Sequence, residues 1–165
     1  MNLYEIIQTR RSVRQYKSTP VPQAKLDRIW EAVRLAPSAC NFQPWRFLVV
    51  RSPEARGSVR EVLQEWTQTA PLLVVALGSP AAAWKRDGQS MHEIDVAIAM
   101  EHLMLAATAE GLGTCWICAF NRKRLAHALK LPKDWEPVAV TPLGYPDDSS
   151  PRTSRKPLTE IVQEI

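Results

Sequence analysis

The chain has 165 residues, of which 45% are hydrophobic and 23% are charged, ordinary values for one soluble globular domain. No apolar run approaches the ~20 residues that a membrane span needs, and three cysteines are too few for a disulfide scaffold. The net charge of +4 permits anionic partners but does not establish one. We therefore expect a single domain over residues 1–165 with no membrane partner.

The N-terminus and the cysteines both bear on the compartment. The first seven residues, Met-Asn-Leu-Tyr-Glu-Ile-Ile, lack the basic start and long apolar segment of a secretion signal. The odd number of cysteines (Cys40, Cys115 and Cys118) fits a reducing environment. We therefore expect a cytoplasmic protein.

Two helices are predicted near the start of the chain. Asn2 is a suitable N-cap for a short helix, and the apolar face of that helix is formed by Leu3, Ile6 and Ile7. Pro22 suits the first turn of a second helix, which should end at Ala36, because the residue before Pro37 is disfavoured in helical geometry. The buried side of this second helix is predicted to comprise Leu26, Ile29, Trp30 and Val33.

Apolar runs and helical periodicity alternate along the rest of the chain. We predict buried strands at residues 47–50, 72–77, 114–118 and 138–143, and helices at residues 53–66, 91–110 and 122–129. The 91–110 helix is apolar on most sides, which indicates a central buried position. Residues 81–89 have little pattern and are predicted to form a loop. Interleaved helices and short apolar strands indicate a sheet covered by helices on both faces, but they leave the strand directions open.

Several common motifs are absent or misplaced. Gly111-Leu112-Gly113 follows a predicted helix and precedes a strand, the reverse of the dinucleotide-binding order. Cys115 and Cys118 are three residues apart on a predicted strand, so their thiols should point to opposite faces and not form a pair. His102, within the apolar helix, is expected to be a hydrogen-bonded core residue. No two of the histidines are spaced as metal ligands, and we expect no metal near His92, His102 or His127.

Basic residues gather in three places. Arg10, Arg11 and Arg14, with Ser12 between them, suit an anion site, because arginine offers forked donors that match phosphate; a charged surface turn is the alternative. A second cluster near the end, formed by Arg152, Arg155 and Lys156, could meet the first on one phosphate. The middle cluster is best explained as solvated surface and consists of Arg122, Lys123 and Arg124.

Residues 37–45 form a segment of unusual composition, Pro-Ser-Ala-Cys-Asn-Phe-Gln-Pro-Trp. They place hydroxyl, amide and aromatic groups on a loop held by two prolines, which suits a polar, planar heterocycle. The alternative is an ordinary helix-to-strand connection in which Asn and Gln satisfy the turn backbone.

Taken together, these segments and others resemble the FMN-dependent nitroreductase family. They occur in the family's order and span nearly the whole chain. The matching segments are Arg10-Arg11-Ser12-Val13-Arg14-Gln15-Tyr16, Ala36-Pro37-Ser38 through Asn41-x-Gln43-Pro44-Trp45, Ala70-Pro71, Gly111-Leu112-Gly113-Thr114-Cys115-Trp116-Ile117, Pro142-Leu143-Gly144-Tyr145-Pro146 and Arg155-Lys156-Pro157-Leu158.

The resemblance implies an α+β, nitroreductase-like fold, with a central mixed but mostly antiparallel sheet covered by helices on both faces. It also implies an intertwined homodimer with FMN bound at the interface. The implied reaction transfers electrons from NADH or NADPH to a small oxidised acceptor, such as a nitroaromatic or a quinone, in a ping-pong order. FMN carries the chemistry while the protein binds and orients it, so no side chain is expected to be a catalytic acid or base.

Carried over by position, the resemblance places the first basic segment around the cofactor. Arg10, Arg11 and Ser12 are expected at the phosphate and ribityl end of FMN, and Arg14 at the N1/O2 edge of the flavin, where negative charge develops on reduction. The phosphate site is expected to be completed by Arg155 and Lys156. Phosphate accounts for these cations, and no nucleic-acid motif is present, so we expect no nucleic-acid partner.

The remaining expected contacts come from three other segments. Gln64 is expected at the polar edge of the ring, and the backbone of Cys118 and Ala119 near flavin N5. The opposite subunit is expected to supply the 37–43 loop, braced by Gln43, through Pro37, Ser38, Ala39 and Asn41.

The chain departs from the family pattern at two places. Cys118 stands where a glycine is common, and its side chain could either narrow the pocket or point away into the sheet. Residues 79–90 are too short for the extra helical segment of larger members, which predicts an open active site with loose acceptor specificity.

Two alternative functions remain on the same fold. One is a flavoenzyme of the reductive dehalogenase type, although those relatives carry extra lid segments. The other is an FMN-binding, electron-storing protein without a productive acceptor.

Overall fold

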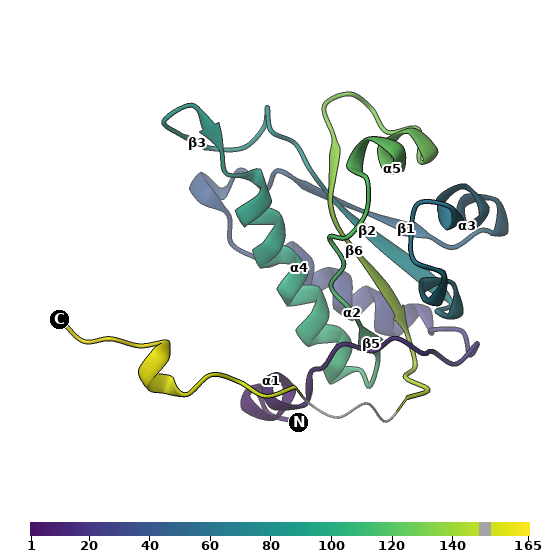
Figure 1. The fold of residues 1–165 in the computed structure, drawn as a ribbon, viewed down its shortest axis with the longest axis horizontal. Helices are drawn as coiled ribbons and strands as arrows, with labels where there is room; N and C mark the ends of the chain where they lie inside the picture. The colour runs from purple at the N-terminus through teal and green to yellow at the C-terminus, as the bar shows by residue number, and fades with distance from the viewer. Residues whose placement is uncertain (149–152) are drawn as a thin grey trace.

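The structure is a computed structural model that describes residues 1–148 and 153–165. Its centre is a four-stranded sheet in the order β1-β2-β6-β5 (Figure 1). The strands are β1 (Trp45–Val50), β2 (Leu72–Gly78), β6 (Glu136–Gly144) and β5 (Gly113–Thr114), and neighbours are antiparallel. A bridge between Ser12 and Thr114 is parallel. The expected mixed, mostly antiparallel sheet is therefore confirmed.

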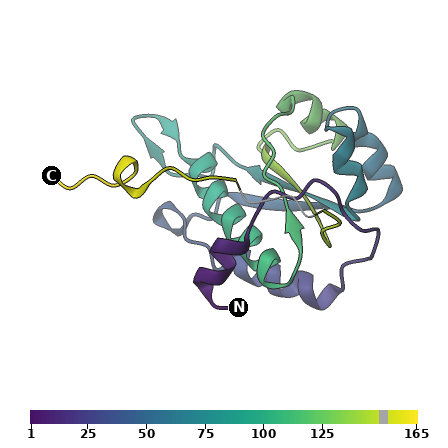
Figure 2. The ribbon, with the colours of Figure 1, turned by 60° about the horizontal axis from the view of Figure 1, so that its bottom comes forward.

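Helices cover both faces of this sheet, as expected (Figure 2). On one side lie α2 (Gln23–Arg34) and α4 (His92–Ala109), and on the other α3 (Pro53–Arg60) and α5 (Arg122–Ala128). Strand β2 is buried along its whole length and supplies both cores. Its alternate residues face opposite sides: Leu72, Val74 and Ala76 join the α2–α4 core, whereas Leu73, Val75 and Leu77 join the α3–α5 core.

The first helix, α1 (Leu3–Thr9), begins as predicted. The Asn2 side chain accepts from the Glu5 N–H, and the Glu5 carboxylate accepts from the Asn2 N–H, which completes a capping box. Its predicted apolar face, however, is not covered within one chain: Leu3 is 58% exposed and Ile7 51% exposed.

Several predicted element boundaries differ from the boundaries in the structure. The helix expected at 53–66 ends at Arg60 and is followed by the 3-10 helix η2 (Glu65–Thr69). The strand expected at 114–118 is only β5 with a separate bridge at Ile117. The second helix ends at Arg34, before the predicted Ala36.

The predicted loop at 81–89 contains a small hairpin. Its strands are β3 (Lys85–Arg86) and β4 (Gln89–Ser90). Asp87 and Gly88 between them have φ angles of 52° and 81°. An Asp-Gly pair of this kind is the usual two-residue hairpin turn, so the signal was present in the sequence.

Two glycines let the segment after α1 lie against the edge of the sheet. A Cβ on Gly113 would lie 2.8 Å from Val13 Cγ2, and a Cβ on Gly144 would overlap Pro71 Cδ and lie 3.3 Å from Tyr16 Cδ1. All three positions are closer than an ordinary contact between carbon atoms. The glycines therefore fix how closely residues 12–16 approach β5 and the end of β6.

We predict that Gly113→Ala lowers the free energy of unfolding by about 1–3 kcal/mol, because Val13 must move to admit the methyl group. Gly57→Ala is the matched control, since its Cβ has nothing within 4 Å and lies in α3, where alanine is favoured by up to about 1 kcal/mol. Urea unfolding measures both. Equal stability of the two variants would contradict the predicted contact.

Candidate functional site

The first basic segment is held along the edge of the sheet. The Val13 N–H donates to Thr114 O at 2.9 Å, and the Tyr16 hydroxyl donates to Val13 O at 2.6 Å. Burial raises the pKa of Tyr16 far above its ordinary value, so the phenol stays protonated and keeps this hydrogen bond. Residues 10–14 are thus fixed in place by backbone contacts and leave their basic side chains for other partners.

Arg11 is already engaged within the chain. Its Nη1 lies 2.5 Å from Asp148 Oδ1, and its Nη2 donates to Asp148 O at 2.7 Å. The Arg14 N–H donates to the other Asp148 oxygen at 3.3 Å. The side chains of Arg11 and Asp148 are 22% and 9% exposed, so the pair is mostly shielded from solvent. Asp148 therefore balances the charge of Arg11 and ties residues 11–14 to the chain beyond β6.

Arg10 lies toward α4, and Arg14 is exposed. The charge of Arg10 acts on Glu101 of α4: burial raises the pKa of Glu101, and the positive charge of Arg10 opposes that rise. A cavity of about 180 Å³ opens here. It is lined by the end of α1, the end of α4 and β5, and includes Thr9, Arg10, Arg11, Thr108, Gly111 and Gly113.

Gln64 and the 118–119 turn meet beside this segment. Gln64 Nε2 donates to Ala119 O at 2.7 Å, while Gln64 Oε1 is buried and has no partner among the described residues. Just after Gln64, Trp66 packs with Val13, Tyr16 and Ala70. The structure thus brings Gln64, Ala119 and residues 10–14 into one region of the molecule.

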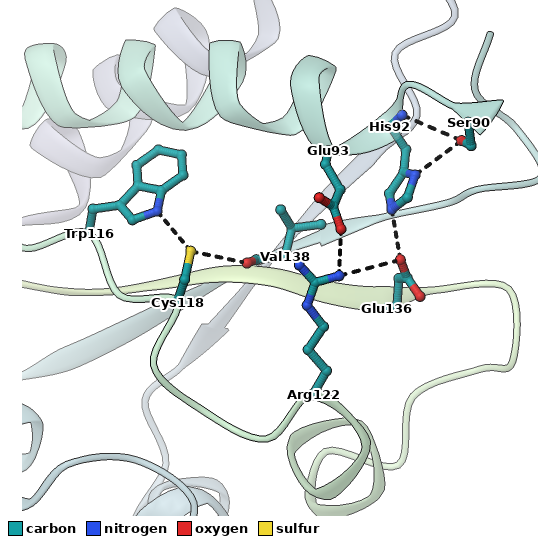
Figure 3. Close-up of polar contacts among 8 residues, drawn as sticks. All are labelled: Ser90, His92, Glu93, Trp116, Cys118, Arg122, Glu136 and Val138. Atoms are coloured by element: carbon teal, nitrogen blue, oxygen red, sulfur yellow. Dashed lines mark hydrogen bonds and ion pairs between the residues drawn. The ribbon is translucent and has the colours of Figure 1, made fainter. Parts of the chain in front are cut away.

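Cys118 points toward β6, the second of the two orientations considered (Figure 3). Its Sγ accepts from Trp116 Nε1 at 3.0 Å and donates to Val138 O at 3.6 Å. The residue is nevertheless exposed, whereas Cys115 is buried, and both are free thiols. The expectation that these two cysteines do not form a pair is confirmed.

The 37–43 loop has a strained backbone stabilised by its own side chains. It contains the 3-10 turn η1 (Ala39–Asn41), and Cys40, Asn41 and Gln43 have φ angles of 50°, 55° and 50°. Ser38 Oγ accepts from the Gln43 N–H at 2.9 Å, and Gln43 Nε2 donates to Asn41 O at 3.1 Å. Pro37, Cys40 and Asn41 are exposed.

One buried residue at this loop was not predicted from the sequence. Asp95, in the first turn of α4, accepts from the Ala39 N–H at 2.9 Å and is 2% exposed. The two residues are 56 positions apart, and an acidic residue early in a helix is ordinary. No local pattern could have indicated this contact.

One chain does not bring all the predicted site residues together. Asp95 lies near the start of α4, next to the 37–43 loop, and Thr108 lies near the end of α4, next to the Arg10 cavity. Because an α-helix rises 1.5 Å per residue, these two residues lie about 20 Å apart. Figure 1 shows the loop and α1 at opposite ends of α4. Arg155 and Lys156 lie on a tail that leaves the body of the protein in both views (Figures 1 and 2). Arg152, from the same cluster, lies outside the described residues.

A charged cluster lies between the start of α4 and the start of α5 (Figure 3). His92 contacts Ser90 Oγ through Nδ1 at 3.0 Å and Glu136 through Nε2 at 2.7 Å. His92, Glu93 and Glu136 place potential metal-binding atoms within 4.8 Å of one another. Arg122, however, lies 2.5 Å from Glu93 and 3.9 Å from Glu136, so its guanidinium supplies the positive charge at this point.

His102 makes the hydrogen bond expected of a histidine within the apolar helix. Its Nδ1 lies 2.9 Å from Ala32 O.

Within residues 1–148 and 153–165, none of the helices combines the length and apolar character required to cross a membrane.

Solved structures with this fold cover nearly the whole chain. A nitroreductase family protein from Clostridium novyi is 38% identical, with a TM-score of 0.85 over 90% of this chain and 87% of its own. A protein from Clostridium difficile named FMN-dependent nitroreductase is 27% identical, with a TM-score of 0.78 over 90% of each chain.

Two curated relatives carry the names of different enzymes. A Thermus thermophilus protein named NADH dehydrogenase is 30% identical over 93% of this chain and 91% of its own length. An iodotyrosine deiodinase of Thermotoga neapolitana is 26% identical over 93% of each. The sequence model of the nitroreductase family matches residues 7–69 and 55–145. The chain therefore belongs to the nitroreductase family.

Proposed function

We propose that this chain is an FMN-dependent oxidoreductase that transfers electrons from NADH or NADPH to small oxidised acceptors such as nitroaromatics or quinones. The proposal rests on one observation: the Arg10–Arg14 segment, Gln64 and the 118–119 turn lie together at one edge of the sheet. The names of the Clostridium difficile and Thermus thermophilus relatives support the same cofactor and electron donor.

The residues of this region fit the parts of FMN. Arg10 and Arg11 line the cavity, and Ser12 and Arg14 of the same segment add a hydroxyl and a further guanidinium group, which suits a phosphate and the electron-rich edge of the flavin. Arg11 adds its charge through a pair that Asp148 already orients. Gln64 retains a buried Oε1 without a hydrogen-bond partner in the described part of the chain, and this oxygen can accept from a ligand N–H.

The cavity of one chain is too small for the whole cofactor. Its volume of about 180 Å³ lies below the roughly 300 Å³ at which pockets for ligands of this size begin. We propose that a second copy completes it with the 37–43 loop, through Pro37, Ser38, Ala39, Asn41 and the bracing Gln43. The phosphate site is completed by Arg155 and Lys156 of the tail.

Uncovered apolar surface supports a homodimer. Ile94 is 54% exposed, and Ile98 and Leu105, on the same face of α4, are only partly buried. The apolar residues of α1 and of the tail are also exposed, including Leu3, Ile7, Leu158, Ile161 and Val162. Glu101 interrupts the α4 face, but exposed apolar surface of this extent is commonly covered by a partner.

Bound FMN supplies the redox chemistry, and the protein supplies binding and orientation. Arg14 would lie at the electron-rich edge of the ring, where its fixed positive charge would stabilise negative charge on the cofactor. Gln64 holds the Ala119 carbonyl, and so fixes the 118–119 backbone that we place near flavin N5. The donor and the acceptor then occupy the same face in turn. The 79–90 segment, which contains the β3–β4 hairpin, is short, and this favours an open site and loose acceptor specificity.

A second candidate is reductive dehalogenation, favoured by the likeness to the Thermotoga neapolitana deiodinase. An electron-storing protein is the remaining alternative. Steady-state assays with a nitroaromatic and with a halophenol separate the two reactions. Rapid flavin reduction by NADH or NADPH followed by reoxidation with either acceptor rules out simple storage.

We predict that the purified protein is yellow and releases FMN on denaturation at about one molecule per chain. The visible spectrum and chromatography of the released pigment measure this. A colourless protein that also fails to take up added FMN contradicts the proposed function.

We predict that Arg14→Met raises the dissociation constant for FMN roughly tenfold or more, because a hydrogen bond to a charged group contributes about 1.5–3 kcal/mol. Quenching of flavin fluorescence on titration measures it. Lys123→Met removes the same charge from the exposed surface of α5 and should leave FMN affinity unchanged. Equal affinities for the two variants would remove Arg14 from the site.

We predict that the wild-type protein has twice the 18.6 kDa mass of one chain and that Ile94→Glu shifts it toward the monomer. A carboxylate in an apolar interface loses hydration without gaining a partner, which weakens association. Light scattering after size-exclusion chromatography, over a range of concentrations, measures this. Leu35→Glu, at a 61% exposed position outside the α4 stripe, is the control.

A further inference from the structure

Asp95 holds a buried carboxylate that is only half satisfied. Its Oδ1 accepts from the Ala39 N–H at 2.9 Å, and its Oδ2 is buried with no hydrogen-bond partner among the described residues. The residue is 2% exposed. The first turn of α4 favours negative charge, but a buried oxygen without a donor still carries a desolvation cost. The buried Oδ2 therefore adds nothing to folding stability, and the role of this carboxylate lies in the hydrogen bond that Oδ1 accepts.

The loop that Asp95 contacts needs an external anchor. Cys40 and Gln43 adopt left-handed backbone angles that non-glycine residues seldom take, and Asn41 adopts them as well. The hydrogen bonds from Gln43 to Ser38 Oγ and to Asn41 O lie inside the loop. They shape it but do not fix it to the rest of the protein.

The Ala39–Asp95 hydrogen bond joins the turn of this loop to α4. Ala39 begins the turn η1, so its N–H lies just before the left-handed residues Cys40 and Asn41. Helix α4 is packed in the core through Val96, Ala99 and other buried residues, which makes it a rigid support. A carboxylate acceptor on that helix therefore fixes the position and orientation of the turn relative to α4.

We propose that Asp95 is the positioning residue of the cofactor loop: by accepting the Ala39 N–H it presets the loop backbone in its ligand-binding conformation. The inference rests on the proposed function in one respect, that residues 37–41 contact FMN. Asp95 itself does not touch the cofactor. It acts through Ala39 and so reduces the ordering that binding requires.

The test compares two substitutions of similar size. Asp95→Asn keeps an acceptor oxygen for Ala39 and puts an amide nitrogen in place of the unpartnered Oδ2, so FMN affinity should stay within about threefold of wild type. Asp95→Leu removes the acceptor, and the dissociation constant should rise about tenfold. Hydrogen–deuterium exchange of residues 38–43, measured without FMN, should be accelerated in Asp95→Leu and close to wild type in Asp95→Asn.

Ser52→Ala is the control for general destabilisation, because it removes the Ser52 cap of α3, away from the loop. It should lower the unfolding temperature and leave loop exchange and FMN affinity unchanged. Wild-type-like exchange and affinity in Asp95→Leu would overturn the proposal, as would an Asp95→Asn variant as impaired as Asp95→Leu.

The wild-type Ala39 amide gives a reading that needs no variant, which matters if Asp95→Leu does not fold. It should exchange slowly, and exchange at the rate of a free amide would overturn the contact. Failure of wild-type protein to bind FMN would instead overturn the proposed function. In that case the exchange data still decide whether Asp95 fixes the loop.

Discussion

The burial of β2 on both faces is the constraint on which the rest of the structure depends. Its seven residues are all buried, with alternate side chains in the two cores, so helices are required on both sides of the sheet. On one side α4 spans the molecule, and its two ends carry the 37–43 loop and the Arg10 cavity. The length of this one helix separates the two halves of the proposed site.

Close backbone packing at the sheet edge positions the cationic half. Gly113 admits Val13 against β5, and the Ser12–Thr114 bridge continues the sheet into the basic segment. Since backbone contacts hold the segment in place, the arginine side chains are not needed for that purpose and can interact with negatively charged groups. Arg11 is the exception, because Asp148 already balances its charge. In our proposal, the site therefore receives an anion without several unbalanced guanidinium groups side by side.

The polar half of the proposed site, the 37–43 loop, depends on side-chain hydrogen bonds and not on close backbone packing. Its loop is held in an uncommon backbone conformation by Ser38 and Gln43, and is fixed to α4 through Asp95. Ile94, an exposed apolar residue of the same helix, lies next to Asp95 in this half. In our proposal, cofactor binding and association of two copies share this helix: a second copy covers its apolar face and delivers its own loop to the cavity in the same step.

The sequence by itself determined what depends on neighbours along the chain. The Asn2–Glu5 capping box, the long apolar stretch of α4 and the apolar runs of β2 and β6 are local, and the order of the motifs identified the family. The Asp87-Gly88 turn was also encoded locally, although it was predicted as a loop.

Only the tertiary structure decided the contacts between distant residues. Arg11 and Asp148 are 137 positions apart, and Asp95 and Ala39 are 56 apart, so neither pair leaves a periodic or motif signal. The orientation of Cys118 toward Val138 likewise depends on how β6 lies beside the 116–118 segment. Local patterns indicate which residues are candidates for binding an anion or a flavin, but chain packing fixes which of them are already paired within the chain.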